Sequence, residues 1–263
     1  MKILLVIFLL FSISCVKDRT SLIEESETSQ SLANKKSIKK RVDSHIDLAI
    51  NSLKNQNYPI AYEQLFKAKK VDPKNARIYN ILGLVYLYDD KHDLAVKNLK
   101  KAISLKKNYS EAHVHLGITY GELEKYDLAI KEFKKAVSNI FYKTPWKAYT
   151  NLGRTYFLMK DYKNAIKIFN KSLSKNSYQC IPYELLGEIY GDIENIEEAK
   201  YNYKESLKYC KGQSLIHKKL GMLFLKEKKE QEALKEFELC LENITQKQRL
   251  LSKECDRYIK LIR

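Results

Sequence analysis

The chain has 263 residues and a formal net charge of +16, with 48 Lys and Arg against 32 Asp and Glu. Four prolines and eight glycines are few for this length, which favours an almost wholly helical protein over a β-rich one. The basic balance favours acidic partners, anionic lipid headgroups or nucleic acid. A genome-wide bias toward lysine codons explains it equally well, so charge alone selects no ligand.

The N-terminal residues have the proportions of a signal peptide. Met1-Lys2 is a short positive region, and residues 3–13 form a nearly unbroken apolar run that is short for a membrane span. Ser14-Cys15 follows, and the next residues are polar. A small residue directly before the first cysteine resembles the lipobox of bacterial lipoproteins. The resemblance implies cleavage of a signal peptide of residues 1–14 and acylation, including palmitate, at Cys15.

Two residues refine this interpretation. Ser12 stands where Leu is commonest in a lipobox, so an ordinary cleaved signal or an uncleaved anchor stays open. Val16 stands where an Asp retains many such lipoproteins in the inner membrane. Several acyl chains anchor a protein stably, so we expect a bacterial cell-envelope protein held at a membrane. The absence of Asp at position 16 favours the outer membrane, with the protein facing the periplasm or the surface.

A polar segment follows the cysteine. It is rich in Ser, Thr and Glu and lacks apolar periodicity, so a flexible tether is expected over residues 15–38. The basic run Lys35–Arg41 is predicted at the start of the first helix. Near an anionic surface each such charge is worth about 1 kcal/mol, although a solvated helix start explains the run equally well.

A pattern of 34 residues then recurs six times. In its clearest copy, Leu116-Gly117 and Tyr120 lie on one predicted helical face, and a second helix carries Ala129, Phe133 and Ala136. The copies are predicted at residues 42–75, 76–109, 110–143, 146–179, 180–213 and 214–247, after an insertion (Thr144-Pro145) between the third and the fourth. A helix-turn-helix unit at this period indicates a solenoid.

The pattern resembles the tetratricopeptide (TPR) repeat, whose Leu, small-residue and Ala positions are filled in every copy. The first copy departs at Ser52, where Tyr is usual, and the closing proline survives only as Pro73. The resemblance implies an all-α, right-handed solenoid in which a Gly or Ala of one helix approaches an Ala of the next. Residues 248–263 keep helical spacing and are predicted to form a capping helix.

The first helices of TPR repeats line a concave groove, which usually binds a peptide. The predicted groove residues are Asn80, Leu84, Val114, Ile118, Lys147, Asn151, Arg154, Phe157, Glu184, Glu188 and Lys218. Asn151 and Arg154 resemble part of the clamp with which some TPR domains hold a C-terminal carboxylate. Val114 and Glu184 stand where that clamp needs polar or basic groups, so the full clamp is absent. A solvated groove without a dedicated ligand is the alternative.

The remaining cysteines form two candidate disulfide pairs. Cys180 opens a first helix and Cys210 closes the second helix of the same copy, so antiparallel packing brings them together. Cys240 occupies a small-residue position facing the capping helix, which carries Cys255. Free buried thiols are the alternative for both pairs.

No residues are predicted to bind a metal or catalyse a reaction. His45, His113 and His217 occupy the fourth position of their copies, where Tyr stands in others, which indicates packing positions. No Gly-rich phosphate loop, nucleophile elbow or zinc-peptidase motif is present in the sequence. We therefore expect neither enzyme activity nor a cofactor.

The expected function is a lipid-anchored scaffold that binds another envelope protein or peptide in its groove. The architecture is similar to pilotin-type TPR lipoproteins of type IV pilus assembly, which implies assistance to an outer-membrane secretin. An adaptor for peptidoglycan enzymes is a related alternative, and a basic surface for an anionic polymer or a membrane is a different one. Nucleic acid is not favoured, because no exposed face interleaves aromatic and basic residues. The sequence leaves the oligomeric state open.

Overall fold

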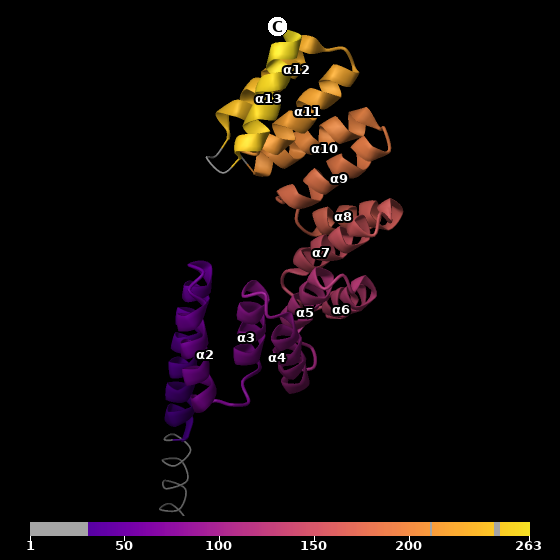
Figure 1. Cartoon of the computed structure of the whole chain (residues 1–263). Helices are drawn as coiled ribbons and strands as arrows, with labels where there is room; N and C mark the ends of the chain where they lie inside the picture. The colour runs from indigo at the N-terminus through magenta and orange to yellow at the C-terminus, as the bar shows by residue number, and fades with distance from the viewer. Residues whose placement is uncertain (1–30, 211, 245–247) are drawn as a thin grey trace, which may run out of the picture. The chain divides into compact units, whose positions relative to one another are not determined.

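The computed structural model describes residues 31–210, 212–244 and 248–263, and their secondary structure is helical without a strand. The predicted signal peptide, Cys15 and most of the predicted tether lie outside these residues. A helix over residues 31–54 is followed by α2 (Tyr58–Val71), α3 (Ala76–Tyr88), α4 (His92–Leu105), α5 (Ser110–Glu122), α6 (Tyr126–Ser138), α7 (Pro145–Leu158), α8 (Tyr162–Lys175), α9 (Cys180–Asp192), α10 (Ile196–Tyr209), α11 (Ser214–Lys226), α12 (Glu230–Glu242) and α13 (Arg249–Ile262) (Figure 1).

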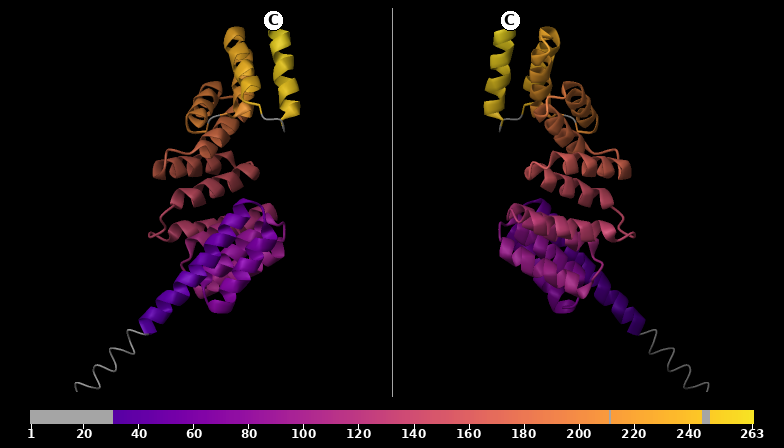
Figure 2. Two further views of the ribbon diagram at one scale, coloured as in Figure 1. Left: turned by 90° about the vertical axis from the view of Figure 1, so that its left-hand side faces the viewer. Right: turned by 90° about the vertical axis from the view of Figure 1, so that its right-hand side faces the viewer.

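The helices belong to two compact units, one ending at Lys106 and the other running from Lys107 to Arg263. In both units each first helix packs against the second helix of the same repeat, as α3 does on α4 and α5 on α6. In the second unit α5 also contacts α7, α7 contacts α9, and α11 contacts α13 (Figure 2). First helices therefore lie beside one another, which confirms the all-α solenoid of stacked helix pairs.

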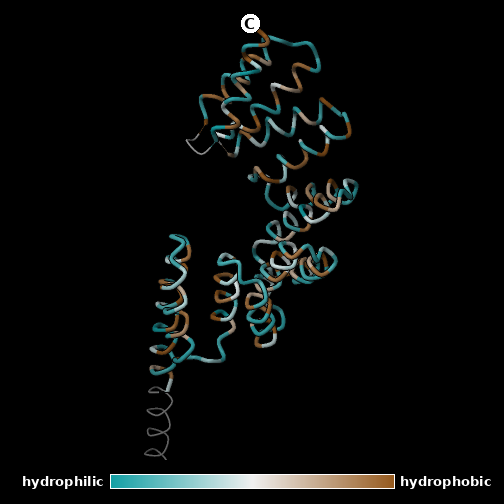
Figure 3. Tube along the Cα trace, in the orientation of Figure 1, coloured by the Kyte–Doolittle hydropathy of each residue, from teal (hydrophilic) through white to brown (hydrophobic). Residues whose placement is uncertain are grey.

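The repeats pack through one apolar stripe on each helix. Hydrophobic and hydrophilic residues alternate along the helical traces (Figure 3), and the small and large members of the pattern, such as Ala129 and Phe133, are buried. A Cβ added to Gly117 would lie 2.6 Å from Cε1 of Phe133. The aromatic ring, and not an Ala as predicted, therefore fills the space over this glycine. The glycine matters because any larger residue at this position would displace the ring.

Each described turn between the two helices of a repeat contains a non-glycine residue with positive φ. These residues are Gln56, Asp90, Glu124, Lys160, Glu194 and Lys228. In the α5–α6 turn the N–H of Lys125 donates to the carbonyl of Tyr120 at 2.8 Å, which is the bond of a Schellman motif. The same backbone turn thus reverses the chain in every repeat without a glycine.

The first helix begins earlier than predicted. Residues 31–38 were expected to belong to the flexible tether, but they are helical and continuous with residues 39–54. Their side chains are mostly exposed, so packing does not hold them. Leu, Ala and Lys are good helix formers, and extending an existing helix avoids a new nucleation cost. The basic run Lys35–Arg41 consequently lies within the helix.

Helix α13 covers the apolar end of the last repeat. Tyr258 stacks on Phe237 with ring centroids 4.7 Å apart, and Ile259 joins the same buried cluster. Leu250 and Leu261 of α13 remain exposed. Among all the described helices, none is long and apolar enough to cross a membrane.

Candidate peptide-binding groove

A hollow of about 280 Å³ lies between α5 and α7. Ile118, Asn151 and Arg154, which were predicted as groove residues, line it. Its other lining residues are Gly117, Gly121, Glu122, Glu124, Tyr126, Phe133, Thr155 and Leu158. We call this site the α5–α7 hollow. It combines an apolar floor, made by the Phe133 ring and Ile118, with polar groups on α7.

We call the side of the first helices that carries the predicted groove residues the groove face. Two cations of α7 lie on it. Lys147 and Arg154 are exposed, and no ion pair within the described residues includes either of them. Asn151 lies between them and donates its Nδ2–H to the carbonyl of Lys147 at 2.8 Å, which leaves its Oδ1 to accept a bond. Burial, and then the charge of Lys147, lowers the pKa of His115 on α5 to about 4, so this ring is neutral at pH 7. The α7 face is thus cationic and holds an amide acceptor.

Glu184 on α9 is the acidic neighbour of this face. Burial raises the pKa of its carboxyl, and Glu188 raises it further, while the charges of Lys219 and Arg154 lower it. The net shift is upward, so the two cations do not fully offset desolvation of the carboxylate. Arg154 therefore acts on Glu184 at a distance and remains available to a second acid.

The groove face of α9, α11 and α13 is neutralised by ion pairs. Lys219 pairs with Glu188, and Lys218 pairs with Glu254 of α13 at 2.6 Å. A second hollow lies here, lined by Glu188, Gly191, Asp192, Tyr203, Lys219, Met222, Leu223 and Lys226. Two of the predicted groove residues, Glu188 and Lys218, are therefore already engaged by partners in the same chain.

The unit ending at Lys106 shows similar pairing. Arg77 of α3 lies 2.7 Å from Asp43 and 3.0 Å from Asp47 of the preceding first helix. Like Lys219–Glu188, these pairs join first helices of adjacent repeats. They hold the first two first helices of this unit together and engage the charge of Arg77.

Two predicted groove residues are buried. Asn80 is 3% exposed and Val114 is 5% exposed, so neither offers a surface to a peptide. The prediction placed them by register alone, and the packing of neighbouring helices covers them. Leu84 is half-buried. Phe157 packs against the buried cluster that contains Ala165 and Phe169 of α8, and its ring stacks on that of Tyr162 with centroids 6.1 Å apart. Only part of the Phe157 ring is therefore accessible to a ligand.

Two glycines that were not predicted shape the hollows. Gly121 lines the α5–α7 hollow and Gly191 lines the second one, and a Cβ at either would meet nothing within 4 Å. They occupy the twelfth position of their repeats, where Leu87 and Phe157 stand in others. The sequence did contain a signal for these two residues, because glycine replaces a large residue at the twelfth repeat position.

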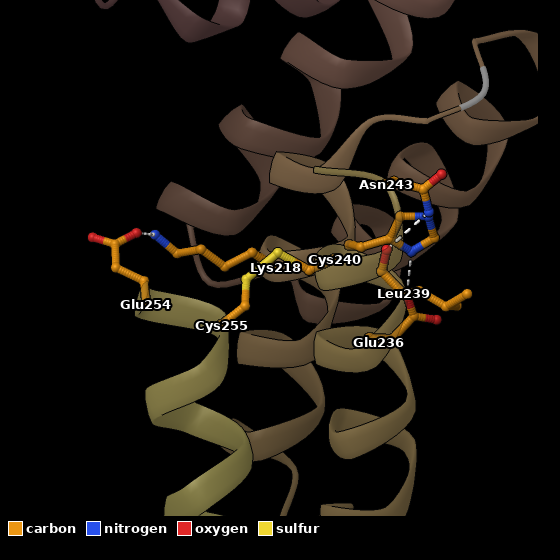
Figure 4. The surroundings of a disulfide bond; sticks show 8 residues. Lys218, Glu236, Leu239, Cys240, Asn243, Glu254 and Cys255 are labelled. Atoms are coloured by element: carbon orange, nitrogen blue, oxygen red, sulfur yellow. Dashed lines mark hydrogen bonds and ion pairs between the residues drawn. A yellow bond between two sulfur atoms is a disulfide. The ribbon is translucent and has the colours of Figure 1, made fainter. Parts of the chain in front are cut away.

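Two disulfides hold the C-terminal repeats. Cys180 is joined to Cys210 across α9 and α10, and Cys240 is joined to Cys255 across α12 and α13. The second bridge and the Lys218–Glu254 ion pair both tie α13 to the last repeat (Figure 4). The capping helix is therefore fixed by a covalent bond, an ion pair and an apolar contact.

The histidines at the fourth repeat position contact the second helix of their own repeat. Nδ1 of His45 lies 2.8 Å from Gln64, and that of His113 lies 2.6 Å from Glu132. His217 and Glu236 form the same contact at 2.8 Å. Among the residues that the structure describes, no group of three metal-ligating side chains comes together. These rings therefore serve helix packing.

Comparison with known proteins agrees with this architecture. The tetratricopeptide repeat family matches residues 76–109, 110–139 and 147–176. PilF of Pseudomonas aeruginosa is similar in structure, with a TM-score of 0.74 and 19% identity over 84% of this chain and 99% of that one. PilW, described as a widely conserved type IV pilus biogenesis factor, has a TM-score of 0.68 and 20% identity over 77% of this chain and 93% of that one.

A third similar structure binds peptide. YrrB, described as a TPR protein with an unusual peptide-binding site, has a TM-score of 0.54 and 16% identity over 73% of this chain and 97% of that one. No curated protein matches the sequence. At identities of 16% to 20%, the likeness of these structures to the chain shows a shared fold and nothing more. The chain thus carries tetratricopeptide repeats within residues 76–176 and folds as an all-α solenoid.

Proposed function

We propose that the chain is a lipid-anchored scaffold that binds an acidic segment of another cell-envelope protein at the α5–α7 hollow. The supporting observation is the contrast in charge along the groove. Lys147 and Arg154 of α7 form no ion pair within the described residues, whereas Lys218 and Lys219 of α11, in the same unit, are paired. Arg154 lines the hollow without an ion pair, and an uncompensated cation favours an anionic group of the ligand at its own position.

The geometry suggests how such a segment binds. An apolar side chain of the ligand enters over Gly121, where no atom fills the space, and contacts Ile118 and Phe133. A neighbouring carboxylate pairs with Arg154, and Asn151 accepts a backbone or side-chain N–H. Glu122 and Glu124 also line the hollow and disfavour a second ligand acid beside them. This polarity fixes the direction of the bound segment.

Anchoring is part of the proposal. Acylation of Cys15 holds the chain at the outer membrane, and the segment before residue 31 spaces the repeats from the bilayer. Mass spectrometry of the membrane fraction tests this directly. A diacylglycerol-modified N-terminal cysteine is the expected product, and an unmodified cysteine or an intact N-terminus would refute the anchor without bearing on the groove.

A second candidate partner follows from the architecture. PilF and PilW are similar to this chain over more than nine-tenths of their own lengths. We infer that an outer-membrane secretin subunit is the partner to test first. Deletion of this chain is then expected to leave the secretin as monomers on a semi-native gel. Normal multimers in the deletion strain would exclude this partner and leave the scaffold proposal open.

Binding at the hollow is tested with purified partner captured by crosslinking in living cells. Arg154→Glu is expected to weaken binding by tenfold or more, as the loss of a charge-assisted hydrogen bond implies. Lys163→Glu is the matched control, because Lys163 is also an exposed cation, lies on α8 and is absent from the lining of the hollow. Unchanged affinity in a folded Arg154→Glu protein would remove this site. Binding that salt abolishes equally in both variants would assign it to the general basic surface instead.

A further inference from the structure

The turn between α6 and α7 presents two large apolar side chains to solvent. Ile140 is 86% exposed and Phe141 is 84% exposed, whereas the next residue, Tyr142, is 7% exposed. An isolated exposed apolar residue is ordinary on a protein surface, but two adjacent ones at the tip of a turn form a protruding apolar contact. This pair takes no part in the groove or in the core.

The turn is held in this conformation by its own hydrogen bonds. Asn139 caps α6, and its Oδ1 accepts the N–H of Phe141 at 3.1 Å, while its Nδ2 donates to Oγ of Ser110 at 2.9 Å. The N–H of Tyr142 donates to the carbonyl of Asn139 at 3.0 Å. These hydrogen bonds hold the backbone that carries Ile140 and Phe141 at the tip of the turn.

The next turn between repeats is built in the same way. Asn176 caps α8 and its Oδ1 accepts the N–H of Tyr178 at 3.0 Å. Tyr178 is 79% exposed and meets Tyr209 edge-on, with ring centroids 5.6 Å apart. Each of these turns follows a second helix in a stack of antiparallel pairs, so both lie on the same edge of the unit (Figure 2). The edge thus carries an exposed aromatic ring in each of two consecutive turns.

The same part of the chain is the most basic. Between Phe133 and Tyr183 the sequence has ten Lys and Arg and a single acidic residue, Asp161. Lys143 lies in the first of these turns, Lys175 lies directly before the second, and both are exposed. A lysine in the last turn of a helix, such as Lys175, also stabilises the helix dipole, but Lys143 lies in the turn itself and has no such role.

We infer that this edge, formed by Ile140, Phe141, Tyr178, Lys143 and Lys175, binds the surface of an anionic phospholipid bilayer. Apolar tips beside lysines match the boundary between acyl chains and headgroups, and aromatic rings concentrate at that depth. A soluble polyanion would use the lysines but leave Ile140 and Phe141 without a partner. Burial raises the pKa of Tyr142, a hydrogen bond with Thr144 lowers it, and the charge of Glu111, the acid facing the turn from α5, raises it further. The inference is independent of the groove.

Trp146 reports on this edge without an added label. It is the single tryptophan of the chain and lies in the first turn of α7, next to the α6–α7 turn. The full chain is mixed with vesicles of phosphatidylcholine and phosphatidylglycerol in equal parts, with bromine on the acyl chains as a short-range quencher. Quenching of Trp146 that grows with vesicle concentration gives an apparent affinity for bilayer contact at this edge.

The variants isolate the two contributions. Ile140→Ser with Phe141→Ser is expected to weaken quenching by tenfold or more, which is about the contribution of two partly inserted side chains. Lys143→Glu with Lys175→Glu is expected to weaken it by a similar factor, since each charge changes sign near an anionic surface. Met159→Ser with Ile193→Ser is the matched control: both are partly exposed, at 42% and 50%, and follow the first helices α7 and α9 at turns within repeats on the other edge. All variants share one N-terminus, so any anchoring by residues 1–30 is common to them.

Each outcome decides the inference. It is upheld when the first two double variants lose quenching, the control keeps it, and pure phosphatidylcholine vesicles quench weakly. Equal quenching by the Ile140→Ser/Phe141→Ser protein, or by uncharged vesicles, would overturn it. So would wild-type protein that binds heparin but shows no quenching with vesicles, which would make the edge a polyanion site. Thermal melts check that the variants fold, as the exposure of the substituted side chains predicts.

Discussion

The α5–α8 repeats and the α9–α13 region share one packing register but use their surface groups differently. In α9–α13 two disulfides and the ion pairs of Lys218 and Lys219 bind neighbouring helices to one another. In α5–α8 the groove cations Lys147 and Arg154 are unpaired, and the turn after α6 exposes Ile140 and Phe141. Similar cores thus leave the surface groups of one region free for recognition, whereas those of the other region hold the end of the solenoid.

The largest expected effect concerns the covalent part of this contrast. Replacing Cys240 and Cys255 by Ser removes a crosslink over 15 residues, which is worth about 3 kcal/mol of unfolding free energy. Hydrogen exchange is expected to rise in α12 and α13 and to stay unchanged in α5–α7. Mass mapping after alkylation, without reduction, is the accompanying check. Four alkylated thiols in native protein would mean that the bridges are absent, and the contrast would then rest on ion pairs alone.

A pair of glycines on α5 separates packing from recognition. Gly117→Leu places a side chain against the Phe133 ring and is expected to cost about 3 kcal/mol in chemical denaturation. Gly121→Leu enters open space and is expected to keep or raise the melting temperature, because Gly is a poor helix former. The second variant should nevertheless lose partner binding, since its side chain fills the α5–α7 hollow. A wild-type melting temperature for Gly117→Leu would contradict the register itself.

The buried contact between His113 of α5 and Glu132 of α6 is expected to make the stability of the α5–α8 repeats depend on acid pH. Burial raises the pKa of Glu132, but hydrogen bonds from His113 and Lys135 outweigh burial, and the pKa lies below its ordinary value. A lowered pKa in the folded state stabilises the protein above the ordinary glutamate pKa, and this contribution disappears as the pH falls through the folded value.

Glu132→Gln tests this sign. The variant is expected to lose about 2 kcal/mol at pH 7, as for other hydrogen bonds to charged groups. Its deficit relative to wild type should shrink as the pH falls below the ordinary glutamate pKa. His45 already faces a glutamine, Gln64, so the contact geometry tolerates the amide. A deficit that stays constant down to acid pH would show that the charge of Glu132 contributes nothing.

The smallest effect tests whether the two regions have the same backbone. Lys160 and Glu194 occupy equivalent turns with φ of 58° and 60°. Replacement of either by Gly relieves a left-handed conformation and is expected to stabilise the protein by about 1 kcal/mol, with equal shifts in both turns. Lys163→Gly, in the exposed first turns of α8, should destabilise instead. Unequal gains at Lys160 and Glu194 would show that the turns differ in strain despite their similar geometry.

Much of the fold could be predicted because its determinants are local. The spacing of Gly117, Tyr120 and Ala129 specifies which face of each helix is apolar, and a helix period fixes that face before any tertiary contact forms. The start of the first helix could not be predicted in this way, because residues 31–38 are held by propensity and continuity and carry no apolar pattern. The fate of the groove residues also depended on neighbours. Val114 is covered, whereas Arg154 is exposed.

The sequence by itself determined the repeat, its register and the helical class, because these follow from a 34-residue spacing of small and large apolar residues. Only the tertiary structure decided which polar groups remain available. Lys219 meets Glu188, Lys218 meets Glu254, and Gly121 opens a hollow. Ion pairs of this kind join residues 31 to 36 positions apart and form only when repeats stack. The physical reason is that the helix period fixes the direction of each side chain around its own helix. Which side chains form ion pairs, and which remain accessible to solvent, depends on the distance between helices.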